Sequence, residues 1–248
     1  MSRVQVWSSG GGVQSATIAA LIVKGDIPPP DLAAIVDTER EATTTWGYMD
    51  AVIQPALNSV GVNLVRIPKS QFATVDLYSS KGDLLIPAFT TETGKVGKFP
   101  TFCSNEWKQR VLRRWVNTQS AEKQFDVWIG ISTDELKRAL QPLGKWQHRH
   151  PLIERRMNRR DCIALVKSMG WPEAPRSSCY ICPNRGTGEW KYLLETAPQD
   201  FAKAVQFEKD MQAVDEDLWL TQSAKPLAEL VDSEGVFTGR CDSGYCFT

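Results

Sequence analysis

The chain has 248 residues, of which 42% are hydrophobic and 23% are charged, a composition typical of a soluble globular protein. Basic and acidic residues both number 29, so no excess of charge directs the whole chain to nucleic acid. No run approaches the roughly 20 apolar residues that a membrane span needs, and the chain does not open on a basic segment followed by an apolar one. We therefore expect a cytoplasmic protein with no membrane partner.

Strand and helix patterns alternate through the first half of the chain. Apolar runs predict strands at residues 4–9, 32–37, 63–67 and 127–132, and an extended stretch at residues 84–88. Helical spacing predicts helices at residues 14–23, 43–60 and 104–117. We expect Ser104 to be the N-cap of the last helix, and Pro55 to kink or split the second. Alternating strands and helices indicate βαβ units, so we expect an α/β fold with a mostly parallel twisted sheet and helices on both faces.

The second half of the chain is mainly helical in pattern. Helices are predicted at residues 158–169, 190–195 and 197–214, and no regular pattern is recognised after Leu218. We divide the chain into an α/β domain, residues 1–150, and a helical, cysteine-bearing region, residues 151–248, that packs on it.

A glycine-rich turn, Gly10-Gly11-Gly12, joins the first predicted strand to the first predicted helix. Glycines let backbone amides turn toward a phosphate, and the helix N-terminus adds partial positive charge. No lysine follows, so the P-loop pattern is absent, and the structural alternative is a tight turn that only joins strand to helix. Asp37 ends the second strand at the same edge of the expected sheet, where ligands of α/β proteins bind, which favours a nucleotide pocket.

The chain contains six cysteines, Cys103, Cys162, Cys179, Cys182, Cys241 and Cys246. Without a secretory segment they favour metal binding or redox chemistry over disulfides. Cys179 and Cys182 form a Cys-x2-Cys pair in a loop, a spacing at which two thiolates hold one zinc ion or one iron–sulfur cluster. Cys103 lies at a helix start, where the helix dipole lowers the pKa of a thiol. Cys162 lies in an amphipathic helix and is expected to be a buried core residue.

Several of these motifs, taken in order, resemble those of the PP-loop superfamily of ATP-pyrophosphatases and sulfonucleotide reductases. Residues 10–15 resemble its Ser-Gly-Gly-x-Asp-Ser loop, and Asp37-Thr38 followed by Glu41 resembles its Asp-Thr-Gly-x-Glu motif. The later glycine-containing strand end and its arginine are matched by Gly130-Ile131-Ser132, Asp134, Glu135 and Arg138.

The cysteine segments resemble one branch of that superfamily. Cys103 with Lys108 resembles the cysteine-to-lysine segment of cluster-bearing adenylyl-sulfate reductases. The downstream motifs are similar to phosphoadenosine phosphosulfate reductase-like proteins, many of them carried by phages and mobile elements: Pro151-Leu152-Ile153, Arg160-Asp161-Cys162, Ser178-Cys179, Cys182-Pro183, Trp190 and the tail from Cys241 to Cys246. For a phage protein, the location would be the cytoplasm of the host.

The resemblance implies an enzyme that binds ATP or an adenylyl nucleotide with Mg²⁺ and cleaves or forms a bond at the α-phosphate, linked to sulfur transfer. It implies nucleotide-binding roles for Ser9, Gly10, Gly11, Gly12, Gln14, Ser15, Asp37, Thr38 and Asp134. Lys108 and Arg138 would stabilise charge in the reaction. A [4Fe–4S] cluster would be held by Cys103, Cys179, Cys182 and Cys241, and zinc is the alternative for the same ligands.

The chain departs from the superfamily pattern at several positions: Gly10 replaces a serine, Gln14 an aspartate, Glu39 a glycine, and Ser104 the second cysteine of a Cys-Cys pair. The reductases' Glu-Cys-Gly-x-His tail is also absent. Structural alternatives are a turn cap for Asp37, helix-start charges for Asp134 and Glu135, a surface pair for Arg138 and a solvated Lys108.

Three functions remain open on the sequence. The first is the ATP-dependent enzyme above, and the second is a true reductase in which Cys241 or Cys246 attacks an adenylyl sulfate. The third is a nucleic-acid-binding module with structural zinc, in which the basic segment of residues 145–160 contacts phosphates. The acceptor would be nucleic acid or a small sulfur-containing metabolite, with a redox or sulfur-donor protein as a further partner.

Overall fold

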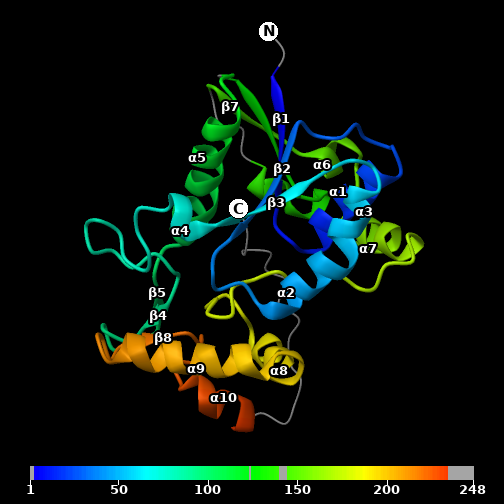
Figure 1. Ribbon diagram of the computed structural model, residues 1–248. Coiled ribbons are helices and arrows are strands. Elements are labelled where there is room, and N and C mark those ends of the chain that lie inside the picture. The colour runs from blue at the N-terminus through cyan, green and yellow to red at the C-terminus, as the bar shows by residue number, and fades with distance from the viewer. Residues whose placement is uncertain (1–2, 123, 140–143, 234–248) are drawn as a thin grey trace.

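A single parallel sheet forms the centre of the computed structural model, which describes residues 3–122, 124–139 and 144–233 (Figure 1). Its strand order is β3-β2-β1-β6-β7, and every neighbouring pair is parallel. The strands are β1 Val4–Ser9, β2 Leu32–Asp37, β3 Leu64–Pro68, β6 Phe125–Ile129 and β7 Trp146–Arg149. The predicted α/β fold with a mostly parallel sheet is confirmed.

Helices cover both faces of this sheet, as predicted (Figure 1). One face carries α1 (Val13–Val23), α6 (Pro151–Glu154) and α7 (Arg159–Ser168), and the other carries α4 (Lys69–Phe72) and α5 (Arg110–Gln119). Side chains alternate along β1, so Trp7 enters the core under α1 and Val6 enters the core under α5. Both side chains are fully buried.

Helix α1 is buried along nearly its whole length, as its alanine, isoleucine and leucine content predicts. Its outer side is covered by α7, whose Cys162 is fully buried in the same core. Cys162 is therefore a core residue, as the sequence predicts. Burial raises the pKa of its thiol to about 11.

The second predicted helix is divided, and Pro55 explains the division. It consists of α2 (Thr43–Tyr48), a π-helical turn (Met49–Ile53) and α3 (Gln54–Asn58). The Gln54 amide bonds to the Met49 carbonyl, five residues back, and Pro55 then occupies the first turn of α3, where its missing N–H costs little.

The helix before α5 also begins with a π-helical segment, Ser104–Gln109. The residue that precedes it is Cys103, so the prediction of Ser104 as the N-cap is wrong by one position. The strand predicted at residues 127–132 begins two residues earlier, at Phe125, and ends at Ile129, since the chain turns at Gly130. A short 3-10 segment, Thr133–Arg138, follows.

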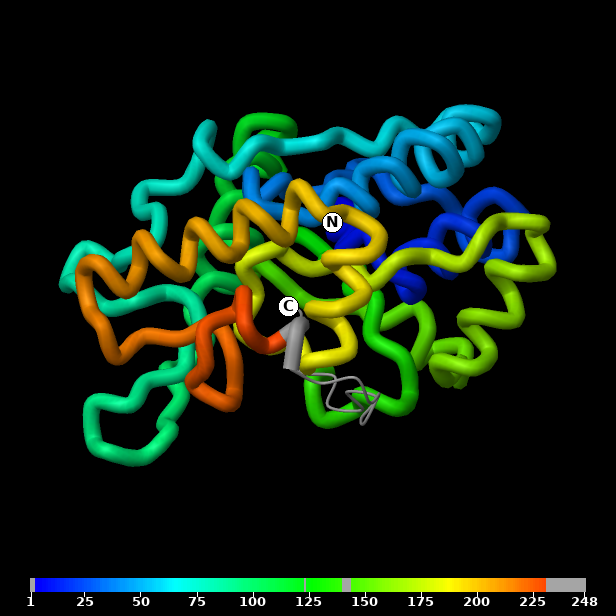
Figure 2. The backbone as a smooth tube through the Cα atoms, turned by 90° about the horizontal axis from the view of Figure 1, so that it is seen from below, coloured from blue at the N-terminus to red at the C-terminus, as the bar shows by residue number. Residues whose placement is uncertain are grey.

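The C-terminal region is helical, as predicted, with α8 (Thr187–Thr196), α9 (Pro198–Gln212) and α10 (Leu227–Ser233). A small antiparallel sheet, β5-β4-β8, joins it to the segment before α5 (Figures 1 and 2). Its strands are β4 Phe89–Thr90, β5 Gly97–Lys98 and β8 Leu218–Trp219. The expectation of no regular structure after Leu218 is wrong, because α10 buries Leu227 and Leu230.

Two of the three described hydrophobic cores contain residues from both sides of position 150. Leu85 and Trp107 share a core with Trp190 of α8, whereas Leu152 and Cys162 share one with α1. A domain boundary at residue 150 stays a prediction. None of the described helices combines the length and apolarity that crossing a membrane requires.

Candidate functional site at the carboxyl edge of the sheet

Three loops meet where the central strands end. The glycine turn follows β1, the segment from Asp37 to Glu41 follows β2, and the turn at Gly130 follows β6. The chain runs from β1 to β2 and β3 on one side and later places β6 on the other side of β1, so the strand order reverses at β1. Such a switch point is where parallel α/β sheets bind ligands.

The glycine turn requires glycine at its second position. Gly11 has φ +78°, and a Cβ atom there would lie 2.8 Å from Cγ2 of Thr45 and 3.3 Å from Cδ1 of Ile35. The Gly10 amide donates to Oγ of Ser15 at 2.7 Å, which closes the turn. No side chain caps α1, so the first-turn amides of this helix can meet an oxygen of a ligand.

The Gly130 turn packs directly on the start of α1. A Cβ atom at Gly130 would lie 3.2 Å from Cβ of Gln14. Nε2 of Gln14 donates to Glu135 at 3.1 Å, and Glu135 forms an ion pair with Arg138. The structure therefore brings Arg138 to the neighbourhood of the glycine turn, but with its charge already paired.

Asp134, in contrast, supports a helix start. Its Oδ2 accepts from the Ser132 hydroxyl at 3.2 Å and from the backbone amide of Arg159, the first residue of α7. These contacts match the structural alternative of a helix-start carboxylate. Its predicted nucleotide contact stays a prediction.

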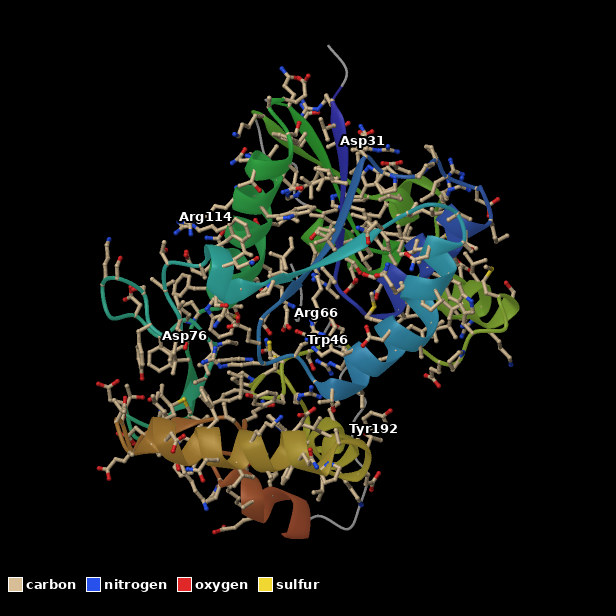
Figure 3. The ribbon with its side chains drawn as sticks, viewed as in Figure 1. Asp31, Trp46, Arg66, Asp76, Arg114 and Tyr192 are labelled. Carbon is tan, nitrogen blue, oxygen red and sulfur yellow. The ribbon has the colours of Figure 1, made fainter. Side chains whose placement is uncertain are left out.

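Asp37 is buried and already bound to protein groups. Its Oδ2 accepts from Nε of Arg66 at 2.9 Å, while Oδ1 accepts from the Glu39 amide at 2.7 Å and caps the turn. Arg66 in turn stacks on the ring of Trp46, 3.5 Å from its centroid (Figure 3). A nucleotide contact of Asp37 would compete with Arg66.

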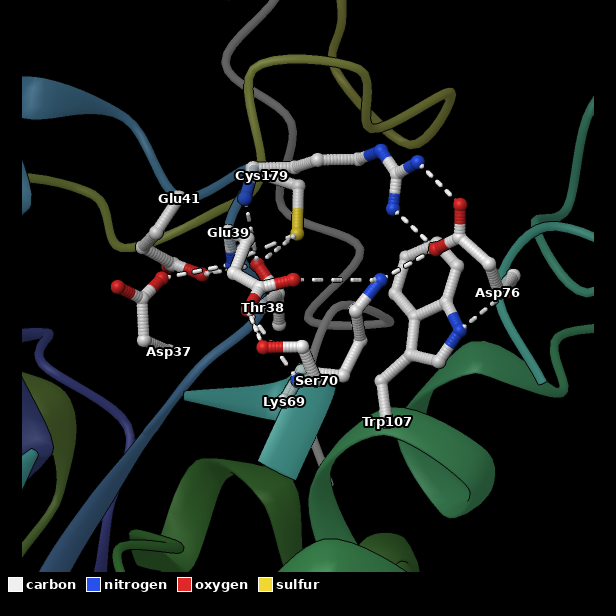
Figure 4. Close-up of polar contacts among 10 residues, drawn as sticks. Asp37, Thr38, Glu39, Glu41, Lys69, Ser70, Asp76, Trp107 and Cys179 are labelled. Carbon is white, nitrogen blue, oxygen red and sulfur yellow. Dashed lines mark hydrogen bonds and ion pairs between the residues drawn. The ribbon is translucent and has the colours of Figure 1, made fainter. Parts of the chain in front are cut away.

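The Cys-x2-Cys loop is attached to the β2 loop by backbone contacts. Glu41 and Cys179 form an isolated antiparallel bridge, and the Tyr180 amide donates to the Arg40 carbonyl at 2.7 Å. Sγ of Cys179 lies 3.1 Å from Oγ1 of Thr38 (Figure 4). The predicted residues Thr38 and Cys179, distant in the sequence, are therefore neighbours.

Ser177 connects the same cysteine loop to the glycine turn. Its hydroxyl contacts the Gly10 carbonyl and lies 2.8 Å from Oε1 of Glu41. It also lies beside Gly11 and Gly12, because Cβ atoms at those glycines would come within 3.2 and 3.7 Å of its side chain. No feature of the sequence pattern indicated this role for Ser177.

Two buried hydroxyl groups at this junction have no partner among the described residues. They are Oγ1 of Thr45, whose methyl group touches the Gly11 position, and Oγ of Ser178, next to Cys179. Buried hydroxyls are normally hydrogen-bonded, so one without a protein partner is suited to bind a water, an ion or a ligand. Both therefore fit a site that takes an oxygen-rich ligand.

Positive charge surrounds the thiols. Lys108 forms an ion pair with the buried carboxylate of Glu41 at 3.7 Å. Burial alone would lower the pKa of Lys108, but Glu41, Cys179, Cys103 and Cys182, in that order, raise it above its usual value. The three candidate cysteine ligands within the described residues therefore all raise the pKa of the Lys108 ammonium group.

Arg185 supplies a second buried cation that the sequence analysis missed. It donates to the carbonyls of Ser178 at 3.1 Å and of Cys179 at 3.3 Å. Burial lowers its pKa, while Cys182 and Cys179 act in the opposite direction. An arginine three residues after a Cys-x2-Cys pair could have indicated this role in the sequence, because a cation there would balance the negative charge of thiolate ligands.

The buried setting of Cys179 disfavours the thiolate form of its side chain. Burial, followed by Glu41, raises its pKa to about 12, although Lys108 and Thr38 oppose the shift. Within the described ranges no three His, Cys, Asp or Glu side chains already form a metal site. Cys241 and Cys246 lie outside the described residues, so the four-cysteine set stays a prediction.

A second polar network lies on the other side of the β2 loop (Figure 4). Both terminal nitrogens of Arg40 donate to Asp76 at 2.7 Å, and Lys69 pairs with the same carboxylate over the ring of Trp107. Arg40, hydrogen-bonded to it, holds the pKa of Asp76 well below its usual range. Arg40, Lys69 and Asp76 line a cavity of about 470 Å³ and were not predicted from the sequence.

Comparison with known proteins finds likeness among solved structures. No model of a known family matches the chain, and no curated protein matches it. Among solved structures, the U34-tRNA thiolase NcsA from Methanococcus maripaludis with its [4Fe-4S] cluster aligns with TM-score 0.44 and 13% identity, over 95% of this chain and 82% of that chain. A likeness of this size assigns neither a ligand nor a reaction to the present chain.

Proposed function

We propose that the protein is an enzyme that binds ATP or an adenylyl nucleotide at the glycine turn and transfers sulfur with the help of a thiol-ligated centre. One observation carries this proposal: the Cys-x2-Cys loop contacts both the glycine turn, through Ser177, and the β2 loop, through the Glu41–Cys179 bridge. A nucleotide and a metal centre would therefore occupy adjacent positions at one edge of the sheet.

The residues at the turn fit a polyphosphate. Gly11 leaves the space that a Cβ atom would fill, the first amides of α1 are uncapped, and the Thr45 hydroxyl is buried without a described partner. These groups would donate hydrogen bonds to phosphoryl oxygens, while the N-terminus of α1 favours their negative charge. Mg²⁺ would arrive with the polyphosphate, as nucleotidyl transfer requires.

The reaction at the α-phosphate would use two cations in different settings. Arg138, held by Glu135 next to Gln14, would turn from its carboxylate to the phosphate charge that develops as the α–β bond breaks. Lys108 lies between Glu41 and the three thiols, so it would stabilise negative charge on the sulfur side. Pyrophosphate would leave as the acceptor is adenylated, and a sulfur nucleophile from a donor protein would then displace AMP from the acceptor.

Cys103, Cys179 and Cys182 fit a metal centre by their surroundings. Lys108 and Arg185 place two cations beside them, against one buried carboxylate, Glu41, so anionic thiolates would balance the local charge. These three cysteines would hold a [4Fe–4S] cluster or zinc, with Cys241 as the fourth ligand. Such a cluster would supply a site that carries sulfur or electrons.

The decisive experiment is an anaerobic preparation with three measurements: iron and acid-labile sulfide per chain, zinc per chain, and pyrophosphate release from ATP. We expect about four irons per chain, and pyrophosphate release that Gly11→Ala abolishes. Stoichiometric zinc without ATP turnover would instead support a binding module. Loss of adenylyl sulfate reduction in a Cys241→Ser/Cys246→Ser variant that keeps its cluster would support a reductase.

A further inference from the structure

A further cavity, of about 1060 Å³, lies at the C-terminal end of α9. It is bounded by the turn between α9 and β8, by the loop around Gly82 and by the segment that precedes Cys103. Figures 1 and 2 show the end of α9 and β8 beside the β4–β5 segment. No residue of the glycine turn or of the β2 loop lines this cavity. We call it the α9 groove.

Negative charge dominates the α9 groove. Its lining carries four carboxylates, Asp83, Asp215, Glu216 and Asp217, and no described lysine or arginine. None of the four takes part in an ion pair among residues 3–122, 124–139 and 144–233. Asp217 and Asp83 accept only from the neutral hydroxyls of Thr91 and Ser79. The groove thus concentrates uncompensated charge in a chain whose net charge is zero.

The remaining wall of the groove is apolar and partly open to solvent. Tyr78, Phe102 and Val214 line it and are 37%, 42% and 76% exposed, so all three belong to the exposed large hydrophobic residues of the described chain. Exposed apolar surface beside a polar rim marks interaction sites. Aromatic faces together with carboxylates also attract cations through both the ring quadrupole and the charge.

We propose that the α9 groove docks a basic segment of a partner protein, with lysine or arginine side chains interleaved with apolar ones. Charge complementarity selects this occupant, since nucleic acid phosphates would be repelled by the four carboxylates. Phe102 directly precedes Cys103, so a bound partner would lie beside the candidate thiol centre. The docking goes beyond the proposed function and does not depend on it, because binding requires neither nucleotide nor metal.

The test uses the full chain and a fluorescein-labelled dodecapeptide of alternating lysine and leucine, with binding followed by anisotropy. A matched peptide of alternating lysine and serine reports the apolar contribution. We expect the leucine peptide to bind more tightly than the serine peptide, and its affinity to fall as salt rises.

Variants of equal charge localise the binding. Asp215→Asn/Glu216→Gln/Asp217→Asn should weaken the leucine peptide about tenfold, as the loss of three charge contacts predicts. The control Asp50→Asn/Glu173→Gln/Glu195→Gln removes three exposed charges elsewhere and should change affinity less than about twofold. Glu216→Lys, a single change at an exposed side chain, should weaken binding even if the triple variant folds poorly.

Hydrogen exchange gives an independent readout. Bound leucine peptide should protect amides in residues 78–84, 99–102 and 212–218. Equal losses of peptide affinity in the two triple variants would overturn the proposal, and so would protection of amides outside these three segments. So would equal binding of both peptides with displacement by spermine, because the groove would then accept any small polycation.

Discussion

At Glu39 the backbone has φ 61°, in the left-handed region that favours glycine. The motif that this segment resembles has glycine at that position, and the structure supplies the physical reason. Here the conformation is held by the side chain of Glu39, which accepts from the amide and the hydroxyl of Ser70. The sequence alone shows the departure but not the contact that compensates for it.

Gly11 and Gly25 offer a matched pair of substitutions. Both have positive φ, +78° and +75°, but only a Cβ atom at Gly11 would meet other groups, whereas nothing lies within 4 Å of the Gly25 position. Gly25→Ala should cost about 1–2 kcal/mol of unfolding free energy from backbone strain alone. Gly11→Ala should cost more, because Thr45 must shift, and it should abolish nucleotide binding. Denaturant unfolding and calorimetric titration with ATP measure both; equal effects of the two changes would contradict the crowding at Gly11.

Substitution of Cys162 and of Cys179 by serine should have different effects on stability and on metal content. Cys162 is fully buried in the core under α1 and α7, so Cys162→Ser should lower the unfolding free energy by about 1–3 kcal/mol, the cost of placing a more polar hydroxyl in an apolar core. Metal content per chain should not change. Cys179→Ser should lower metal content instead, and metal analysis of both variants beside denaturant unfolding checks this. Loss of metal in Cys162→Ser would show that the cysteine assignment is wrong.

Among the elements, the strands β1, β2 and β3 follow from their apolar runs, and β2, which is buried along nearly its whole length, needs little else. Strand β7 was missed because its sequence, Trp-Gln-His-Arg, has no apolar run; it is an edge strand fixed by pairing with β6. Helix α10 was missed for a similar reason, since packing against α8 and α9 decides it. Tertiary contacts override local pattern in both cases.

The candidate site likewise contains residues that the sequence pattern predicts and residues that only tertiary contacts reveal. The glycine turn and the Cys-x2-Cys pair carry local spacing, so the sequence reveals them. Ser177, Arg185 and Asp76 act through partners that are distant along the chain or through backbone carbonyls, and no local pattern encodes such contacts. The nucleotide, the metal and the acceptor stay predictions.

The network around Asp76 joins the β2 loop, α4 and the π-helical segment before α5, so its loss should affect all three. The pKa of Asp76 is lowered by Arg40 and Lys69, so its ionised form stabilises the fold above the ordinary pKa of an aspartate. That stabilisation should disappear progressively as the pH falls below about 4. Asp76→Asn should be less stable than the wild type at pH 7, and the difference should shrink toward pH 2. Denaturant unfolding across this range, with Asp50→Asn as control, measures it; a constant difference would refute the linkage.

At the scale of the whole molecule, the cysteine loop lies between the parallel sheet and the helices α8–α10. If Cys103, Cys179 and Cys182 hold a metal centre, its removal by a chelator should loosen this junction before it affects the central strands. Amide exchange should then rise in residues 176–186 and remain slow in β1 and β2. Hydrogen exchange with and without metal tests this, and uniform change along the chain would show that the centre does not act at the junction.

The central position of β1 has a consequence for biosynthesis. Its partners are β2 on one side and β6 on the other, and Val4 pairs with Phe125, so one edge of the first strand stays unpaired until about half of the chain has been synthesised. At the usual pace of translation the delay is on the order of ten seconds. An unpaired apolar strand is prone to aggregation during such an interval. Recombinant yield should therefore depend more on growth temperature and chaperone supply than on the stability of the finished fold.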